Sequence, residues 1–156
     1  MKKVINLTQH SATPAQIEAG VVEPEISEKS EIQALLTFDT LPSQAEIKRR
    51  AIKLAREAYL EARQLAINRG EYGCGTSVFS ADCSCTCPDC VSTVQGQKVM
   101  IGGAPYLMSS LEKELRRWGL VPVYAFSKRE CVEEQKEDGS VVKRTVFKFE
   151  GFIEAL

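Results

Sequence analysis

A strand–helix–strand pattern over residues 99–130 constrains the fold of this chain more than any other part of its sequence. Gly102-Gly103 follows a short apolar run and permits a tight turn, and Pro105 suits the first turn of a helix, where its missing N–H costs nothing. Apolar residues recur at helical spacing over 106–118, and a second apolar run occupies 120–126. This order predicts two parallel strands joined by a right-handed helical crossover.

The N-terminal part of the chain predicts a further strand and a short helix. Residues 3–7 form a β-type run that stops at the polar tripeptide Thr8–His10. A helix is expected over 14–18, because the hydroxyl of Ser11 or of Thr13 can accept a hydrogen bond from its first turn. The first strand therefore delivers a polar, histidine-containing segment to its carboxyl end.

The middle of the chain predicts the longest helix. Residues 21–29 are acidic and contain a proline, which is typical of a connection, and 31–38 fits a strand or a helix equally well. The long helix is expected over 43–68, where Ser43 and Glu46 have the spacing of a capping box. Five of its cations are expected to form a solvated face, namely Lys48, Arg49, Arg50, Lys53 and Arg56.

The C-terminal part predicts a β-hairpin. Residues 131–135 and 140–149 have strand character and flank a turn in which Gly139 can adopt a positive φ. The aromatic residues of this region are expected to cover the sheet: Phe147, Phe149 and Phe152.

The order of these elements predicts a single α/β domain over residues 1–156. It is expected to be a Rossmann-like sandwich with a mainly parallel central sheet and an antiparallel C-terminal hairpin at its edge. Ligands of such sheets bind beyond the carboxyl ends of the strands. The candidate site residues are the polar and small residues expected at those ends: Thr8, Gln9, His10, Gly102, Gly103, Ala104, Ser127, Lys128 and Arg129.

Two of these groups could bind an anion together. The Gly102–Ala104 turn precedes a helix whose free N–H groups attract negative charge, although a plain tight turn explains these residues equally well. Lys128 and Arg129 could neutralise a phosphate, and Ser127 adds a hydroxyl. In the alternative interpretation the two cations form ion pairs with Glu130.

His10 is the single histidine of the chain. A lone histidine is more often a structural residue than a catalyst, but this one is expected at the ligand end of a strand. An imidazole titrates near neutral pH, so His10 could deprotonate a hydroxyl or protonate a leaving oxygen.

A cysteine-rich insertion is expected over residues 71–97. It contains five of the six cysteines and has no sustained periodicity. In a reducing compartment such a cluster suggests a structural zinc or free thiols before disulfides. The candidate zinc ligands are Cys83, Cys85, Cys87 and Cys90.

Composition excludes several classes of partner. A formal net charge of −1 argues against duplex DNA, whose binding needs a broad basic surface. No apolar run approaches the roughly 18 residues that span a bilayer, and the N-terminus does not have the pattern of a signal peptide. A cytoplasmic protein with no membrane partner is expected.

Three segments carry a resemblance to a known family. Residues 101–130 and 133–152 resemble the C-terminal half of small Rossmann-like proteins encoded near type III CRISPR systems. A glycine-rich strand end, a helix, a G-x-x-P-x-Y strand, an S/T-x-R step and a hairpin follow in the same order. Residues 6–16 look like the opening strand, polar end and T-x-x-Q helix start of the same group. The family often has a histidine after the hairpin phenylalanine, where this chain has Lys148.

The resemblance implies a CARF-related protein of antiviral defence that binds a cyclic oligoadenylate, and several members act as ring nucleases. It implies a homodimer with metal-independent cleavage and no required cofactor. His10, Lys128 and Arg129 would then act in catalysis, and the ligand would be bound by Thr8, Gln9, Gly102, Gly103, Ala104 and Ser127. Two alternatives stay open: a non-catalytic sensor or sponge for the same ligand, and an unrelated nucleotide-processing or structural α/β protein.

Overall fold

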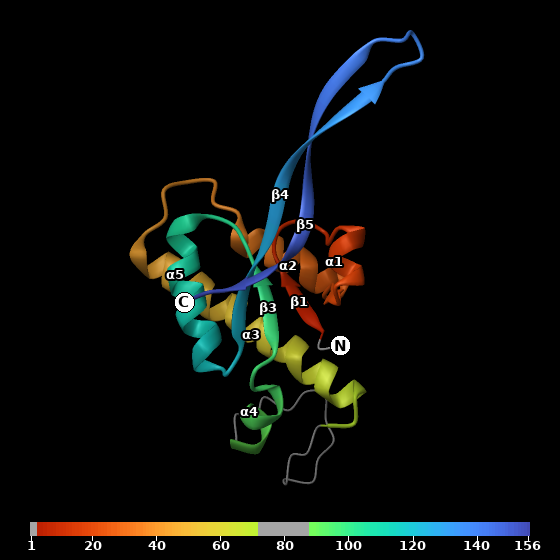
Figure 1. Ribbon diagram of the computed structural model, residues 1–156. Helices are drawn as coiled ribbons and strands as arrows, with labels where there is room; N and C mark the ends of the chain where they lie inside the picture. Colours follow the sequence, from red (N-terminus) through yellow and green to blue (C-terminus); the bar gives the residue numbers. More distant parts are fainter. Residues whose placement is uncertain (1–2, 72–87) are drawn as a thin grey trace.

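The computed structural model describes residues 3–71 and 88–156, and its centre is a five-stranded sheet in the order β2-β1-β3-β4-β5 (Figure 1). Neighbouring strands from β2 to β4 run parallel, and β5 pairs antiparallel with β4 at the edge. The predicted α/β fold, with a mainly parallel sheet and an antiparallel C-terminal hairpin, is therefore confirmed. The strands are β1 (Val4–Leu7), β2 (Val21–Val22), β3 (Lys98–Ile101), β4 (Val121–Gln135) and β5 (Val141–Glu154).

Helices connect the parallel strands, and their ends follow local sequence signals. The side chain of Thr13 accepts a hydrogen bond from the amide of Gln16, and the Ser43 hydroxyl does the same for Glu46. Gly119, just after α5, has a φ of 75°, which glycine adopts readily. The helices are α1 (Pro14–Glu18), α2 (Ile26–Leu36), α3 (Gln44–Asn68), α4 (Pro88–Val94) and α5 (Pro105–Arg117).

The main core lies on one face of the sheet. Small residues along α3, including Ala51, Ala55 and Ala58, are fully buried, which lets this helix pack closely against α5. Strand residues Leu7 and Ile101 belong to the same cluster. The opposite face carries a smaller cluster, with Val4, Val21, Met100 and Val123 buried and Ala12, Val121 and Phe152 packed against them.

Two expectations about the middle of the chain need correction. The acidic segment 21–29 is not only a connection, because α2 begins at Ile26 and runs through the ambiguous residues. Ile32 and Leu36 are buried one helical turn apart, so burial of this stripe decides for helix. Arg50 of α3 does not simply face solvent, since its guanidinium donates to the carbonyl oxygens of Leu35 and Thr37 at the end of α2.

The C-terminal hairpin is longer than expected. A strand end was expected at Phe126, but β4 continues without a break to Gln135 and pairs with β5 from Val123 onward, with one register shift between Phe126 and Ser127. Each residue of this ladder gains a cross-strand partner, which a strand pattern read on one segment alone does not reveal. The ribbon leaves the body as an arm (Figure 1). Phe152 packs on the sheet as expected, but Phe147 lies on the arm and is 72% exposed.

Nothing in the described part of the chain resembles a membrane span, because no helix there is both long and apolar enough. The candidate zinc ligands Cys83, Cys85 and Cys87 lie outside the described residues, as does the side chain of Cys90. Within the described residues, no group of three or more histidine, cysteine or acidic side chains could hold a metal ion.

Candidate functional site

The strand order creates a topological switch point between β1 and β3. From β1 the chain turns towards β2, whereas from β3 it turns towards β4 on the other side. In open α/β sheets the connections diverge at such a point, and ligands bind in the crevice beyond the carboxyl ends of the strands. A cavity of about 420 Å³ opens there. It is lined by Thr8, Gln9, His10, Ser11, Thr13, Gln16, Met100, Ile101, Gly102, Gly103, Tyr124 and Ala125.

The structure thus brings together five of the residues predicted from the sequence, namely Thr8, Gln9, His10, Gly102 and Gly103. The rest of the lining is neutral: hydroxyl and amide groups come from the start of α1, and Met100, Ile101 and Tyr124 are apolar or aromatic. No lysine or arginine is among these lining residues. The cavity suits a ligand with many hydrogen-bonding groups and a planar, partly apolar body.

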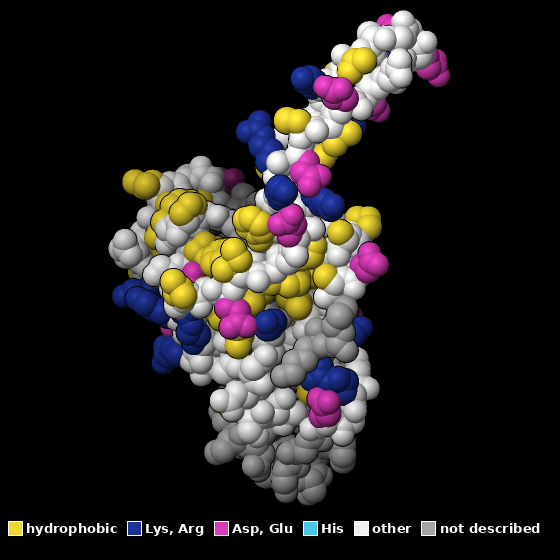
Figure 2. All heavy atoms as spheres, viewed as in Figure 1, with side chains coloured by type: hydrophobic (Ala, Val, Ile, Leu, Met, Phe, Trp, Pro, Cys, Tyr) yellow, Lys and Arg dark blue, Asp and Glu magenta, His cyan; other side chains and the backbone are white. Residues whose placement is uncertain are grey.

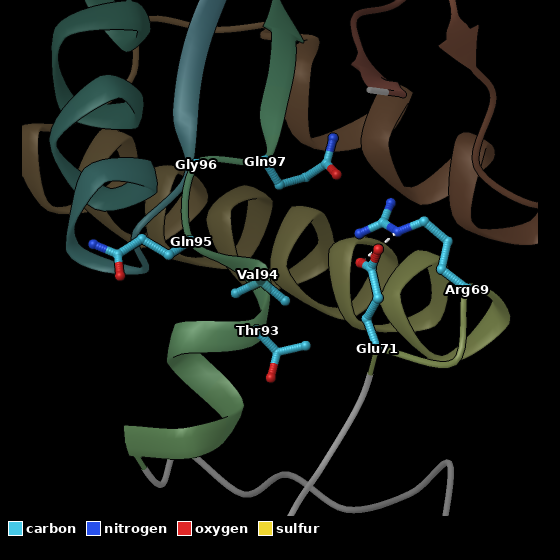
Figure 3. A pocket seen from close by; sticks show the side chains of 7 residues that line it. All are labelled: Arg69, Glu71, Thr93, Val94, Gln95, Gly96 and Gln97. Atoms are coloured by element: carbon cyan, nitrogen blue, oxygen red, sulfur yellow. Dashed lines mark hydrogen bonds and ion pairs between the residues drawn. The ribbon is translucent and has the colours of Figure 1, made fainter. Parts of the chain in front are cut away.

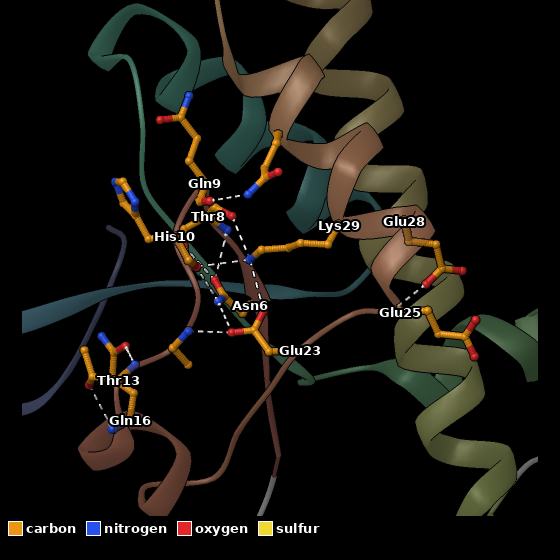
Figure 4. A network of polar contacts seen from close by, with 12 residues as sticks. Asn6, Thr8, Gln9, His10, Thr13, Gln16, Glu23, Glu25, Glu28 and Lys29 are labelled. Atoms are coloured by element: carbon orange, nitrogen blue, oxygen red, sulfur yellow. Dashed lines mark hydrogen bonds and ion pairs between the residues drawn. The ribbon is translucent and has the colours of Figure 1, made fainter.

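Asn6 fixes the loop that carries His10. Its side chain is completely buried, and its Nδ2 donates to the carbonyl oxygen of His10 (2.8 Å) and to Oε1 of Glu23 (2.7 Å) (Figure 4). Its Oδ1 accepts from the amide (3.0 Å) and the hydroxyl (2.7 Å) of Thr8. Two donors and two acceptor positions are thereby satisfied, which is what a buried amide requires.

The ion pair between Lys29 and Glu23 supports the same loop. Lys29 donates to the carbonyl oxygens of Thr8 (2.9 Å) and His10 (3.1 Å), and its ammonium lies 3.0 Å from Oε2 of Glu23. Burial alone would raise the pKa of Glu23, but hydrogen bonds from the Ala12 amide, Asn6 and Lys29 outweigh it and lower the pKa. Glu23 therefore stays ionised and keeps the Lys29 ammonium next to the carbonyl oxygens of Thr8 and His10.

α2 holds the other side of the loop. The side chain of Gln33 donates to the backbone carbonyl oxygen of Gln9 (2.8 Å). The side-chain Nε2 of Gln9 in turn donates to the hydroxyl of Thr37 (3.1 Å). The backbone around His10 is therefore fixed by Asn6, Lys29 and Gln33. The His10 imidazole is exposed, points away from this network (Figure 4), and has no hydrogen-bond partner within the described residues.

The glycine turn after β3 forms the facing wall. Gly103 has a φ of 155°, a conformation that residues with a Cβ rarely adopt. A Cβ at Gly102 would only make an ordinary 3.6 Å contact with Thr8. α5 begins directly afterwards, and its N-cap residue Ala104 makes no side-chain hydrogen bond to the first turn. Pro105 has no N–H and the Leu107 amide donates to the carbonyl oxygen of Ala104, so Tyr106 carries the first-turn amide that is left uncapped.

Tyr124 closes the cavity on the side of β4. Its hydroxyl donates a 2.5 Å hydrogen bond to Oε1 of Glu112 on α5. Burial, and next the hydrogen bond to Glu112, raise the pKa of Tyr124 to about 12. Tyr124 is thus a neutral wall of the cavity across the whole physiological pH range.

The predicted basic residues lie farther along β4, outside the lining of the cavity. Ser127, Lys128 and Arg129 are in the middle of this strand rather than at its end. Side chains alternate along a strand, so Ser127 and Arg129 share the side of Ala125, which lines the cavity, whereas Lys128 is on the other side. With a rise of about 3.3 Å per residue, Arg129 is roughly 13 Å beyond Ala125. Ala104 also lies outside the lining, as the N-cap of α5.

The supporting residues Asn6, Glu23, Lys29 and Gln33 were not predicted from the sequence. One signal was available, because an asparagine inside a buried apolar strand must find hydrogen-bond partners. The other three come from the acidic connection and from α2, which no short motif links to the end of β1.

A second cavity, of about 310 Å³, lies at the opposite end of the strands, where β3 begins (Figure 3). It is lined by the segment that precedes β3 and by Arg69 and Glu71, whose side chains form an ion pair of 2.7 Å with each other. The charges of this cavity are already paired, and it is not at the ligand end of the strands. The switch-point cavity is therefore the better candidate.

Comparison with known proteins gives one similarity. The model of the family described as Uncharacterized protein MJ1673 matches residues 87–153, which span α4, β3, α5, β4 and almost all of β5. No curated protein and no solved structure matches the chain significantly. The part of this chain that is similar to the MJ1673 family thus includes the glycine turn and the arm, but not the loop that carries His10.

Proposed function

We propose that this protein binds a cyclic oligoadenylate in the switch-point cavity and cleaves it as a metal-independent ring nuclease. The observation that carries the proposal is the His10 imidazole, which is exposed over the cavity on a loop fixed by buried hydrogen bonds. The resemblance of residues 6–16 and 101–152 to proteins encoded near type III CRISPR systems supplies the class of ligand.

The chemistry uses the ribose itself as nucleophile. The 2′-oxygen attacks the adjacent phosphorus, so that an O2′–P bond forms and the P–O5′ bond breaks, which gives a 2′,3′-cyclic phosphate and a 5′-hydroxyl. His10 takes the proton of the 2′-hydroxyl or gives a proton to the departing 5′-oxygen. Holding the 2′-oxygen in line with the leaving oxygen supplies much of the acceleration.

The other residues bind and orient the ligand. The amides of the Gly102-Gly103 turn, which lines the cavity, and of Tyr106 in the first turn of α5 are the backbone donors for a phosphate of the ligand. Thr8 and Gln9 present side-chain polar groups at the same edge. Arg129 and Ser127 lie on the same side of β4 and extend the site towards a ligand larger than one nucleotide.

A binding-only role is the second candidate, because the lining of the cavity contains no lysine or arginine. A transition state with additional charge on the phosphate would receive little stabilisation there unless Arg129 reaches it. A sensor or sponge needs only the hydrogen-bonding lining and the glycine turn.

One assay distinguishes these functions. Cyclic oligoadenylates of several ring sizes are incubated with the protein and a metal chelator, and both retention and linear products are measured. His10→Ala is expected to lower the cleavage rate by about 10²-fold or more while retention changes only a few-fold. Gln44→Ala, on the exposed start of α3, is the control. Retention without cleavage by the wild type would favour the sensor, and no retention of any ring would contradict both.

A further inference from the structure

The arm formed by β4 and β5 is a two-stranded ribbon that little else in the molecule supports. Beyond Phe126 both of its faces are largely exposed, and Val132, Val142 and Phe147 lie on it with more than a third of their surface accessible. Figure 2 shows the arm projecting from the body with charges of both signs along it. A two-stranded ribbon is only marginally stable in water, and three or more strands give a stable sheet.

The edge of β4 along the arm is free to pair. β3 pairs with β4 only as far as Met100 and Val123, and no other strand of the described chain lies along this edge beyond that point. Unpaired edges of this kind are templates for another strand. The arm therefore offers a row of backbone donors and acceptors next to exposed apolar side chains.

The charges of the segment 128–138, which covers the outer part of β4 and the turn after it, are complementary to those of a second copy of the same segment that runs in the opposite direction. Lys128, Arg129 and Glu130 form one end, and Lys136, Glu137 and Asp138 form the other, with Glu133 midway between them. In an antiparallel pair of two such segments centred on Glu133, the two strands overlap over 131–135, and Glu130 comes opposite Lys136, the first residue after the strand. Glu137 and Asp138 lie in the turn, so this acidic turn comes beside the basic Lys128-Arg129 segment of the second copy without being in register with it.

These charges are mostly not used within one chain. Among the described residues, no ion pair involves Lys128, Arg129, Glu130, Lys136 or Glu137. The central glutamates, which would face acidic or apolar residues, are instead paired with cations of β5: Glu133 with Lys143 (3.4 Å) and Glu134 with Arg144 (4.0 Å). Each of the two central glutamates thus already has a cation of its own chain beside it.

The edge of β5 does not have this property. Apart from Glu150 at the register shift at its base, its charges on the arm are positive (Lys143, Arg144 and Lys148), so self-pairing over the outer part of the arm would set like charges against each other. Pairing of β4 with β5 of another copy would be head-to-tail and would not close into a dimer. The charges therefore favour pairing of β4 with β4 of the second copy over any pairing that involves β5.

We propose that β4 of this arm pairs antiparallel with β4 of a second copy, about a two-fold axis at Glu133, to form a four-stranded ribbon. Because a two-fold contact is made twice, each dimer contains two copies of every facing pair. This interface needs no ligand, so it can be tested separately from the proposed nuclease activity.

Charge reversal on the full-length chain tests the arrangement. Glu130→Lys and Lys136→Glu each place like charges at two symmetric positions, and each is expected to weaken dimerisation about tenfold in sedimentation velocity. The double variant restores opposite charges and is expected to recover the wild-type dissociation constant within a few-fold. Lys113→Glu, exposed on α5, is the control for net charge.

A disulfide tests the register independently. The arrangement places Cys131, which is exposed and free, opposite Gln135 of the second copy, so Gln135→Cys is expected to form a covalent dimer on mild oxidation. The two positions are four residues apart on one strand, about 13 Å, and cannot form a disulfide within a chain. Adding Cys131→Ser must abolish the covalent dimer.

The outcomes are decisive in both directions. A monomer at every accessible protein concentration overturns the proposal, as does a dimer that neither charge reversal weakens. A covalent dimer that persists after Cys131→Ser overturns the register. Loss of cyclic oligoadenylate binding with an intact dimer would contradict only the proposed function.

Discussion

Asn6 and Glu23, which are 17 residues apart in the sequence, are joined by a 2.7 Å hydrogen bond from Nδ2 of the asparagine to Oε1 of the glutamate. This bond ties the buried end of β1 to the segment that follows β2. Through Asn6 and Lys29 it also fixes the carbonyl oxygen of His10. The position of the candidate catalytic residue therefore depends on two residues that do not line the cavity.

Asn6→Ala should be among the most destabilising polar substitutions in the chain. It removes four hydrogen bonds and leaves Glu23 and Thr8 with unsatisfied groups, so the free energy of unfolding is expected to fall by about 2–3 kcal/mol. Urea unfolding measures the change. Asn68→Ala, at the exposed end of α3, is the control and should change it by less than about 0.5 kcal/mol. Equal effects of the two variants would contradict the network.

Glu23 gives the fold a defined acid sensitivity. Its pKa is lowered in the folded protein, so its contribution to stability is present above the ordinary pKa of 4.5 and is lost as pH falls through the folded-state pKa. Glu23→Gln should be less stable than the wild type at pH 7, and the difference should shrink on acidification. Thermal unfolding at several pH values below 5 tests this, and a difference that does not change with pH would argue against an ionised Glu23.

Glu61 is expected to have the opposite pH dependence. Burial, followed by the hydrogen bond and the negative charge of Glu28 and the charges of Glu25 and Glu57, raises its pKa to about 8. The folded state thus keeps a proton that the unfolded state releases near 4.5, so stability falls as pH rises from about 4.5 to about 8. Glu61→Gln should remove this loss and stabilise the protein at pH 8 by about 1 kcal/mol, since partial exposure screens the charges.

Denaturant unfolding at pH 5 and pH 8 measures the effect of Glu61→Gln. Glu18→Gln, on the exposed surface of α1, is the matched control and should show no such gain. A benefit of Glu61→Gln that is equal at the two pH values would show that repulsion between carboxylates is not its cause.

The two glycines of the turn after β3 should respond differently to alanine. Gly103 has a φ of 155°, so Gly103→Ala strains the backbone and is expected to cost about 1 kcal/mol or more. Gly102→Ala only adds a 3.6 Å contact to Thr8 and should cost less than about 0.5 kcal/mol. Chemical denaturation of both variants tests this order. If Gly102→Ala is the more damaging, the turn has a different conformation.

Tyr124→Phe isolates the bond between β4 and α5. It removes the hydrogen bond to Glu112, so stability is expected to fall by about 1 kcal/mol. Tyr106→Phe is the matched control, because Tyr106 is exposed and its edge contact with Phe38 does not need the hydroxyl. Calorimetry on both variants measures the difference, and indistinguishable melting temperatures would mean that the Tyr124 hydroxyl bond contributes nothing.

The sequence by itself determined the local elements and the place of the candidate site. The apolar runs, the hydroxyls of Thr13 and Ser43, and the glycines at positions 119 and 139 act on neighbouring residues, so their effects can be predicted from short segments. The meeting of Thr8–His10 with Gly102-Gly103 was also predictable, because the carboxyl ends of parallel strands share one edge of a sheet.

Only the tertiary structure decided how the site is supported and where the basic residues lie. Hydrogen bonds join Asn6 to Glu23, Lys29 to the carbonyl oxygen of His10, and Gln33 to the carbonyl oxygen of Gln9. The partners are 17 to 24 residues apart in the sequence, so these pairings depend on packing rather than on local spacing. In the same way, β4 passes through Ser127–Arg129 to Gln135 because β5 supplies a cross-strand partner at nearly every step. That pairing places Arg129 on the arm instead of at the end of a strand, since a strand ends where its partner ends.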